Sequence, residues 1–405
     1  MEVGKEESLI SDIREYAKTF TENGVSSFQN KIEQNLNVWK EKKLNIAVVG
    51  DSGAGKSSLI NAILGLTAED EGAAPVGSME TTMTIEKYVN PLHPNLVFSD
   101  MPGIGTPNFP RDSYFAKIGQ DLTEFDFFLI VCSGRFKEND LWFANIIHSQ
   151  RKEFYFVRTH TDEDVLSNKH DFPQTHNQET LLALLKNRLF DELNRAQIAT
   201  NQDHIFLVDN YDPTKYDFEK LLDTLVVNAP SIKKDTLILS LAITTNNLID
   251  EKVKVLKDRV YIKALLACVG SLVPLPGVGV AVEASVLYQE YQFYREQLSI
   301  DDKSMQNISE RLDVSKENLE KKLNMKSHMV SVSLQAFVKF LSVHVASEGI
   351  ENVVKAALPI ISSVLAAGVS YPLCVHSLKN LLAMCEKEAR AAHYDVEIMF
   401  LKQHQ

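Results

Sequence analysis

Residues 50–57, with the sequence GDSGAGKS, constrain the fold of this chain more than any other feature. They match a phosphate-binding loop, in which glycines let backbone N–H groups turn inward around a phosphate. The apolar run LNIAVVG at 44–50 predicts a buried strand before the loop, and SSLINAILGL predicts a helix after it. This order suits a nucleotide cradle because the helix N-terminus adds a positive dipole. The alternative is a glycine-rich turn without a ligand. The predicted phosphate contacts are Gly50, Asp51, Ser52, Gly53, Ala54, Gly55, Lys56, Ser57 and Ser58.

Further short apolar runs predict strands that alternate with helices. They lie at 95–100, 125–133, 154–159 and 204–209, and helical spacing fills segments such as 179–195. Strands that alternate with helices indicate a mostly parallel sheet covered on both faces. We therefore expect an α/β P-loop domain at 43–230.

The chain on either side of this domain is predicted to be helical. Strand patterns end near Pro230, so residues 231–405 are expected to form an all-helical domain. Residues 1–42 also show helical spacing, but they cannot bury a core alone. We expect them to pack on the C-terminal helices, and the length of 405 residues suits two or three domains.

Charge and cysteine usage exclude some classes of partner. The formal net charge is 42 − 54 = −12 without a long basic run, so nucleic acid is not an expected partner. The four cysteines have no metal or disulfide-framework spacing, which favours reduced thiols in the cytoplasm. The first residues lack the pattern of a signal peptide and the glycine needed for N-myristoylation.

Polar residues after the second predicted strand are candidate metal and γ-phosphate ligands. Asp100 can hold Mg²⁺ together with the Ser57 hydroxyl, and the Gly103 N–H can meet a γ-phosphate. The loop 72–84 can supply a threonine to the metal, with Thr82 as first choice and Thr81 as second. An ordinary surface loop is the alternative for that segment.

The sequence THTD at 159–162 is predicted to select the base. It closes a strand where GTPases carry [NT]KxD, and the carboxylate of Asp162 can accept hydrogen bonds from guanine N1 and N2. Adenine offers a mismatched edge, so GTP and GDP are the expected ligands. His160 occupies the position where a lysine usually packs along the nucleotide. The alternative role for Asp162 is a helix cap after the strand. Asp209 and Asn210 are weaker candidates for a final base contact.

Taken together, these motifs resemble the immunity-related GTPases, the interferon-inducible family related to dynamin-like GTPases. The resemblance rests on GDSGAGKSSLINAILGL, GAAPVGSMETTM, SDMPGIGTPNF, FYFVRTHTDEDV and, beyond the nucleotide domain, SLVPLPGVGVAVEASVLYQEYQFYREQLSIDD. It covers nearly the whole chain. Lys56 places the chain with members that carry GKS, while His160 departs from the usual lysine.

The catalytic step is expected to need a second molecule. Small GTPases orient water with a glutamine after DxxG, but Ile104 occupies that position and its side chain cannot orient water. The resemblance implies that GTPase domains face each other as a homodimer or oligomer, with Glu80 as a catalytic participant beside Lys56 and Thr82. A nucleotide-switched binding module with negligible turnover is the alternative.

Two apolar stretches, 264–287 and 356–375, are nearly long enough to cross a bilayer. Prolines interrupt both, which favours buried core. The alternative is peripheral membrane attachment through the second stretch, where Ile361 and Leu365 would share a helix face. The resemblance to a family that acts on internal and vacuolar membranes keeps this alternative open.

Overall fold

The structure is a computed structural model of the chain. It describes residues 2–77, 85–90, 93–104, 106, 108–119, 121–198, 200–243, 245–269, 278–312, 314–331, 333–344, 354, 357 and 370–403. These residues form two compact units. One is Trp39–Thr245, and the other joins Met1–Val38 to Asn246–Gln405.

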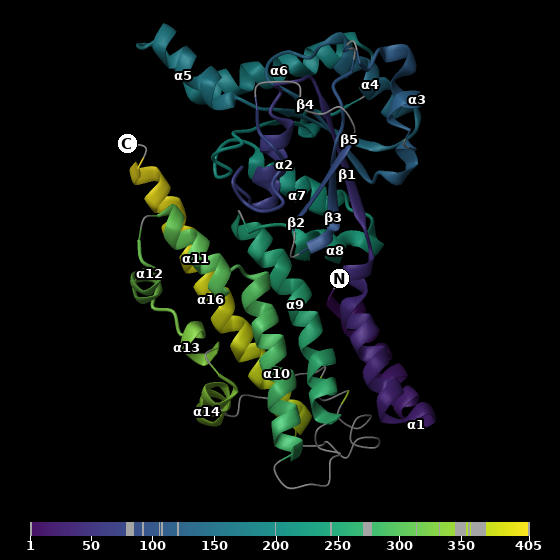
Figure 1. Cartoon of the computed structure of the whole chain (residues 1–405), viewed down its shortest axis with the longest axis vertical. Helices are drawn as coiled ribbons and strands as arrows, with labels where there is room; N and C mark the ends of the chain where they lie inside the picture. Colours follow the sequence, from purple (N-terminus) through teal and green to yellow (C-terminus); the bar gives the residue numbers. More distant parts are fainter. Residues whose placement is uncertain are drawn as a thin grey trace. The chain divides into compact units, whose positions relative to one another are not determined.

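Among the described residues of the first unit, six strands form one sheet in the order β2-β3-β1-β4-β5-β6 (Figure 1). All neighbouring strands are parallel except β2 and β3, which pair antiparallel at one edge. The central strand β1 places Ile46 opposite both Phe98 and Phe127. The strands are β1 (Leu44–Gly50), β2 (Glu86–Asn90), β3 (His93–Asp100), β4 (Phe127–Cys132), β5 (Glu153–Arg158) and β6 (Ile205–Leu207).

Helices cover both faces of this sheet. Alternate strand residues, such as Val49 and Ile130, share a core cluster with α3, α4 and α6 on one face. Figure 1 shows α2 and α7 on the other side of the sheet. The helices are α2 (Lys56–Leu64), α3 (Tyr114–Ile118), α4 (Glu138–Ser149), α5 (Thr161–Asp171), α6 (Gln178–Arg195), α7 (Phe218–Asn228), α8 (Lys234–Ser240) and the 3₁₀ turns Arg111–Ser113, Leu122–Glu124, Gln202–His204 and Ser231–Lys233. The predicted α/β P-loop architecture is confirmed.

The sequence patterns predicted five of these strands and missed β2. The residues of β2, EKYVN, contain only two apolar side chains between polar ones and form no apolar run, as an edge strand can. The five others are short apolar runs, and β3, β4 and β5 are buried along most of their length. The apolar runs therefore identified the strands that are buried on both faces of the sheet.

The boundary between the units lies at Thr245 rather than at the predicted Pro230. Helix α8 belongs to the first unit, Trp39–Thr245, in which Thr236 donates a hydrogen bond to the Trp39 carbonyl at 2.9 Å. Ser240 on the same helix donates to the Asn95 side chain at 3.4 Å. These two contacts hold α8 beside β3, although α8 has the helical spacing expected of the other unit.

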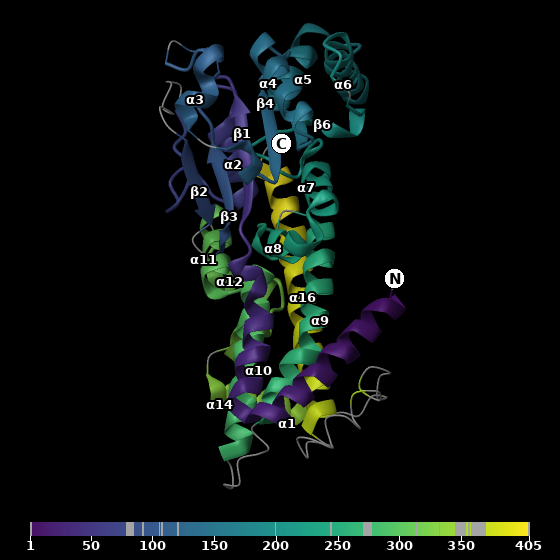
Figure 2. The same ribbon diagram turned by 90° about the vertical axis from the view of Figure 1, so that its right-hand side faces the viewer.

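The second unit is helical throughout its described residues. Its N-terminal part is α1 (Glu2–Glu41) as far as Val38, and this helix bends at Gly24, whose φ of 79° and ψ of −178° suit glycine alone (Figure 2). The bend lets Asn35 donate to the Tyr16 hydroxyl at 2.7 Å. The other helices are α9 (Asn246–Ala267), α10 (Val278–Gln297), α11 (Asp302–Arg311), α12 (Lys316–Lys322), α13 (Ser327–Ser331), α14 (Leu334–His344) and α16 (Ser370–Gln403).

Arg259 joins the N-terminal helix to the C-terminal helices of this unit through a hydrogen bond and a buried ion pair. Arg259 on α9 donates to the Leu36 carbonyl of α1 at 2.5 Å and to Glu290 of α10 at 3.1 and 3.2 Å. Glu290 is only 1% exposed, so its charge needs these partners. Residues from 1–38 therefore pack against the C-terminal helices, in the way expected of a region without its own core.

Many of the described residues of the two apolar stretches are buried, whereas Ala281 in the first and Leu373 in the second are exposed. Leu265, Leu266 and Cys268 are buried in the first, and Tyr371 and Cys374 in the second. Ile361 and Leu365 lie outside the described residues. No helix in the described part of the chain is long and apolar enough to cross a membrane.

Candidate functional site

The predicted phosphate loop follows the central strand of the sheet and ends at helix α2. A Cβ on Gly50 would lie 2.1 Å from the Val131 carbonyl oxygen, so only glycine fits between β1 and β4 there. Gly55 has a φ of 81° and caps the N-terminus of α2. All the predicted contacts from Gly50 to Ser58 lie in this loop and the first turn of α2. The backbone geometry is that of a phosphate cradle.

The three charged or polar side chains expected around the phosphates are brought together. Lys56 Nζ donates to the carbonyls of Gly50 at 3.2 Å and Asp51 at 3.1 Å, and it lies 4.0 Å from Asp100 Oδ1. Ser57 Oγ donates to Asp100 Oδ2 at 3.1 Å. A hydroxyl and a carboxylate side by side are hard oxygen ligands of the kind that Mg²⁺ prefers. The donor set therefore fits a nucleotide-bound magnesium ion.

The switch residues are only partly described. Glu80, Thr81 and Thr82 lie outside the described residues, so these predicted catalytic and metal contacts stay predictions. Gly103 lies against the phosphate loop, since a Cβ there would be 3.6 Å from the Ser52 backbone nitrogen. This is the placement that a γ-phosphate contact through the Gly103 N–H requires.

Ile104 points away from the phosphates. Its side chain is 4% exposed and belongs to the core cluster beneath α3 and α4. Its carbonyl oxygen accepts a hydrogen bond from the Asn139 side chain at 2.7 Å. A buried apolar side chain held in this way cannot orient an attacking water.

The base-selecting motif meets the phosphate loop through buried hydrogen bonds. Thr159 is fully buried and donates to the Ala54 carbonyl at 2.8 Å. Asn210 donates from its side-chain amide to the Gly55 carbonyl at 3.0 Å. Asp162 lies half-buried in the first turn of α5. The residues expected to hold the base therefore sit at the same sheet edge as the phosphate loop.

His160 and Asp209 have local roles in the loops where they lie. His160 has a φ of 54°, and its Nδ1 lies 2.9 Å from the Glu163 carboxylate. Asp209 Oδ1 accepts backbone hydrogen bonds from Tyr211 at 2.9 Å and Asp212 at 3.3 Å. Burial, together with the nearby charge of Asp162, raises the pKa of Asp209. Of the Asp209 and Asn210 pair, the structure links only Asn210 directly to the phosphate loop.

Two further residues belong to the site although the sequence analysis gave neither of them a role of its own. Thr159 opens the base-selecting motif, and its position where GTPases carry Asn or Thr is the signal that could have identified it. Lys137 follows β4, and its Nζ lies 2.5 Å from Asp51 Oδ2 in the phosphate loop. This hydrogen bond with Asp51 raises the pKa of Lys137. The carboxyl ends of parallel strands lie at one edge of the sheet. Lys137 follows β4, so its position near the phosphate loop becomes predictable only once the strand order is known.

Replacing Thr159 with valine is expected to weaken GTP binding roughly tenfold. Valine has nearly the same shape but leaves the Ala54 carbonyl without its buried donor, which costs about 1–3 kcal/mol. Titration with a fluorescent GTP analogue measures the effect. The matched control is Thr236→Val, which removes a buried hydrogen bond to Trp39 in the same unit. An equal change in GTP affinity for both variants would contradict a specific role of Thr159.

Comparison with known proteins gives a consistent set of relatives. The model of the interferon-inducible GTPase family (IIGP) matches residues 9–364. Interferon-inducible GTPase 1 of Mus musculus is 35% identical over 277 residues, which are 68% of this chain and 66%, just under two thirds, of that protein. T-cell-specific guanine nucleotide triphosphate-binding protein 2 of Mus musculus is 36% identical over 77% of this chain and 74% of its own length. Interferon-inducible GTPase 5 of Rattus norvegicus is 30% identical over 93% of this chain and 81% of its own length.

Proposed function

The chain belongs to the interferon-inducible GTPase family, and we propose that its nucleotide state controls self-association and action at internal membranes. Family membership makes it a GTP hydrolase built on a P-loop. The observation that carries the proposal is the burial of Ile104 at the position where a water-orienting side chain is needed. A site that lacks this group in one molecule can obtain it from another.

In the proposed reaction, the phosphate loop binds and orients the triphosphate. The N–H groups of the loop and the dipole of α2 offset the phosphate charge, and Lys56 reaches the β- and γ-phosphates. Ser57 and Asp100 would hold Mg²⁺ directly or through water, with Thr82 as a further ligand. When bound, the metal would offset part of the negative charge of the triphosphate. These residues reduce the charge repulsion that a water nucleophile meets.

We propose that the residues that select the base also hold the phosphate loop in position. Asp162 accepts hydrogen bonds from guanine N1 and N2, a pattern that adenine cannot supply. Thr159 and Asn210 hold the loop carbonyls of Ala54 and Gly55 beside this motif. A nucleotide that fits Asp162 therefore meets a phosphate loop already fixed in position. Because the base and the triphosphate must both bind correctly, GTP is favoured over ATP.

Self-association is proposed to complete the catalytic site. Two GTPase domains would face each other as a homodimer, and Glu80 would take part in activating water. Higher oligomers would need a second contact, because two domains that face each other form a closed dimer. The burial of Ile104 supports this scheme because its apolar side chain cannot replace the glutamine of small GTPases.

The specific activity of GTP hydrolysis is expected to rise with protein concentration. A bimolecular step between two nucleotide-loaded chains makes the rate per molecule depend on how many molecules are paired. Phosphate release at saturating GTP, measured over a hundredfold range of protein, tests this directly. Turnover per molecule that stays constant over the whole range would overturn the pairing scheme.

The same measurement distinguishes the self-associating GTPase from a second candidate function. Ile104 also suits a nucleotide-switched recruitment module that holds GTP or GDP with negligible turnover. That function predicts tight GTP binding without phosphate release at any protein concentration. Membrane action in cell-autonomous defence is the remaining part of the proposal, with the protein in the cytoplasm and peripherally attached to internal or vacuolar membranes. Flotation with vesicles tests this part independently of hydrolysis.

A further inference from the structure

The hydroxyl of Tyr114 holds the peptide that carries the Gly103 N–H. Tyr114 lies on α3 and donates a hydrogen bond to the Pro102 carbonyl at 2.9 Å. This carbonyl and the Gly103 N–H belong to the same peptide unit, which is trans. A trans peptide points its C=O and its N–H in opposite directions. Because the carbonyl is held toward Tyr114, the Gly103 N–H points away from it.

Gly103 itself lies against the phosphate loop. A Cβ on Gly103 would lie 3.6 Å from the Ser52 backbone nitrogen and 3.9 Å from the Gly50 carbonyl oxygen. The peptide that Tyr114 holds is therefore next to the backbone groups that are expected to surround the phosphates. This position suits an N–H that meets an oxygen of the γ-phosphate.

Tyr114 is fixed in place by aromatic neighbours. It is fully buried, and its ring lies 5.5 Å from the Phe115 ring and 6.3 Å from those of Phe109 and Phe143. All three contacts are edge-to-face, the geometry that aromatic pairs prefer. Burial and the nearby charge of Asp100 raise the pKa of Tyr114, so the hydroxyl keeps the proton that it donates. The core thus supplies a rigid donor to the Pro102 carbonyl.

A second hydrogen bond holds the residue after Gly103. Asn139, in the first turn of α4, donates its side-chain amide to the Ile104 carbonyl at 2.7 Å. The amide oxygen of Asn139 accepts from Arg111 Nε at 3.3 Å and from Arg111 Nη2 at 2.7 Å. Arg111 in turn lies over the Trp142 ring. The amide cannot rotate without breaking these bonds, so the carbonyls on both sides of Gly103 have fixed donors.

We propose that Tyr114 is a positioning residue for GTP, which directs the Gly103 N–H at the γ-phosphate, and that Asn139 supports the same segment. The inference rests on the nucleotide-binding part of the proposed function and adds the side chains that prepare the γ-phosphate contact. A donor that is already oriented avoids the reorganisation that a mobile loop would need. GDP lacks the γ-phosphate, so this contact distinguishes GTP from GDP.

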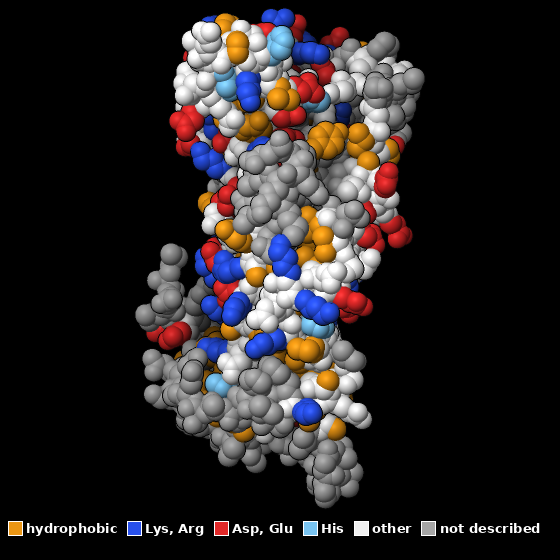
Figure 3. All heavy atoms as spheres, turned by 90° about the vertical axis from the view of Figure 1, so that its left-hand side faces the viewer, with side chains coloured by type: hydrophobic (Ala, Val, Ile, Leu, Met, Phe, Trp, Pro, Cys, Tyr) orange, Lys and Arg blue, Asp and Glu red, His pale blue; other side chains and the backbone are white. Residues whose placement is uncertain are grey.

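The distinction between GTP and GDP depends on groups close to the γ-phosphate more than on the charge of the outer surface. Figure 3 shows Lys and Arg side chains intermixed with Asp and Glu on one face of the chain. The fields of opposite charges largely cancel at a distance, and salt screens what remains. One oriented N–H within hydrogen-bond reach of the γ-phosphate can therefore contribute more to this distinction than the surface field.

The test compares Tyr114→Phe with the wild type in titrations of the full chain with GDP and with a non-hydrolysable GTP analogue. Phenylalanine keeps the ring and its packing but leaves the Pro102 carbonyl without its donor, so the peptide can rotate. We expect the affinity for the GTP analogue to fall about tenfold, the equivalent of one hydrogen bond. The affinity for GDP should change by less than about twofold, because GDP does not reach the Gly103 N–H.

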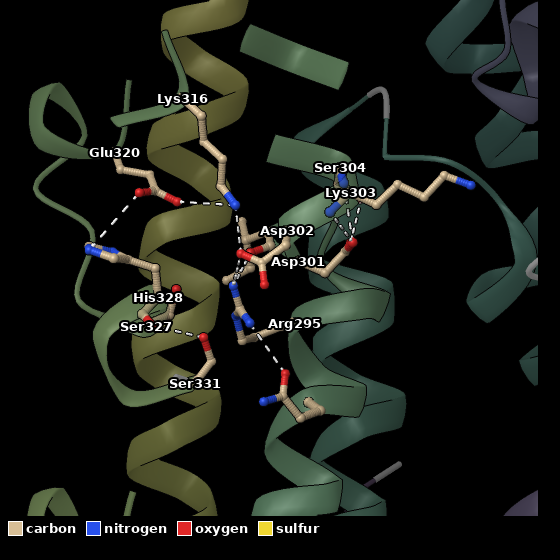
Figure 4. A network of polar contacts seen from close by, with 12 residues as sticks. Arg295, Asp301, Asp302, Lys303, Ser304, Lys316, Glu320, Ser327, His328 and Ser331 are labelled. Carbon is tan, nitrogen blue, oxygen red and sulfur yellow. Dashed lines mark hydrogen bonds and ion pairs between the residues drawn. The ribbon is translucent and has the colours of Figure 1, made fainter. Parts of the chain in front are cut away.

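Tyr291→Phe is the matched control, because it also removes a buried hydroxyl that donates to a backbone carbonyl. Tyr291 donates to the Ser327 carbonyl at 2.6 Å in the second unit, where Ser327 lies next to His328 (Figure 4). This variant should lower the melting temperature to a similar extent as Tyr114→Phe. It should leave the ratio of the affinities for the GTP analogue and GDP unchanged.

Asn139→Asp is a second variant that leaves the aromatic core intact. Aspartate keeps an acceptor for Arg111 but loses the N–H that binds the Ile104 carbonyl. It should also weaken binding of the GTP analogue more than binding of GDP. The effect should be smaller than that of Tyr114→Phe, because Asn139 does not hold the peptide that contains the Gly103 N–H.

The outcomes distinguish this inference from the function on which it rests. If the wild type binds both nucleotides and Tyr114→Phe weakens them equally, or weakens neither, nucleotide binding stands and the positioning role is wrong. If the wild type binds neither nucleotide, the proposed function is wrong as well. If Tyr114→Phe does not fold, an unchanged affinity ratio in Asn139→Asp overturns the inference. A selective loss of the GTP analogue in Tyr291→Phe would overturn it too.

Discussion

Replacing Lys56 with alanine is expected to lower GTP hydrolysis by roughly 100-fold or more. Lys56 is 8% exposed, so its ammonium acts on the phosphates with little screening by water. Its Nζ lies 3.1 and 3.2 Å from two carbonyls of the loop, and a bound triphosphate offers it charged oxygens in their place. The change removes a cation that is needed most as charge moves onto the leaving phosphate. Phosphate release under single-turnover conditions measures the loss.

The same variant also tests the link between nucleotide and assembly. If the γ-phosphate drives self-association, the Lys56→Ala protein should not assemble when GTP is added, as followed by light scattering. Lys257→Ala, an exposed lysine of α9, is the control for loss of one positive charge. Hydrolysis within a few-fold of the wild type would show that Lys56 does not contact the phosphates. Unchanged assembly with impaired hydrolysis would separate assembly from nucleotide binding.

The parts of the fold that the sequence predicted correctly are those in which local pattern and burial coincide. Strand β1, the phosphate loop and α2 are contiguous, so their order along the chain already determines their arrangement. Strand β2 was missed because an exposed edge strand needs no apolar run. Helix α8 was assigned to the wrong unit because helical spacing does not reveal its hydrogen bond to Trp39.

The site shows the same division between local and distant contacts. Lys56, Ser57 and Asp100 were predicted because each follows a recognisable strand, and strand ends in a parallel sheet meet at one edge. The hydrogen bonds of Thr159 to Ala54 and of Asn210 to Gly55 join residues far apart in the chain. Spacing alone carries no information about such contacts, which depend on the order β1-β4-β5-β6 in the sheet.

The substitution Asp162→Asn is expected to change the base preference from guanine to xanthine. The Asp162 carboxylate can accept from both N1 and N2 of guanine, and such charge-assisted bonds are about twice as strong as neutral ones. Asparagine replaces one acceptor with an N–H donor that faces the N2 amino group, so affinity for GTP should fall roughly 100-fold. Xanthine carries an oxygen at that position, and the new amide can donate to it.

Competition between GTP and xanthosine triphosphate for a fluorescent analogue measures this exchange. The control is Asp171→Asn at the exposed end of the same helix, which removes an equal charge away from the motif. Asp209 Oδ1 already accepts hydrogen bonds from the backbone of Tyr211 and Asp212. A variant that retains full preference for GTP would show that Asp162 does not select the base. A gain in affinity for xanthosine triphosphate together with a loss of affinity for GTP requires that Asp162 contacts the base. Removing a helix cap would affect the affinities for both nucleotides equally.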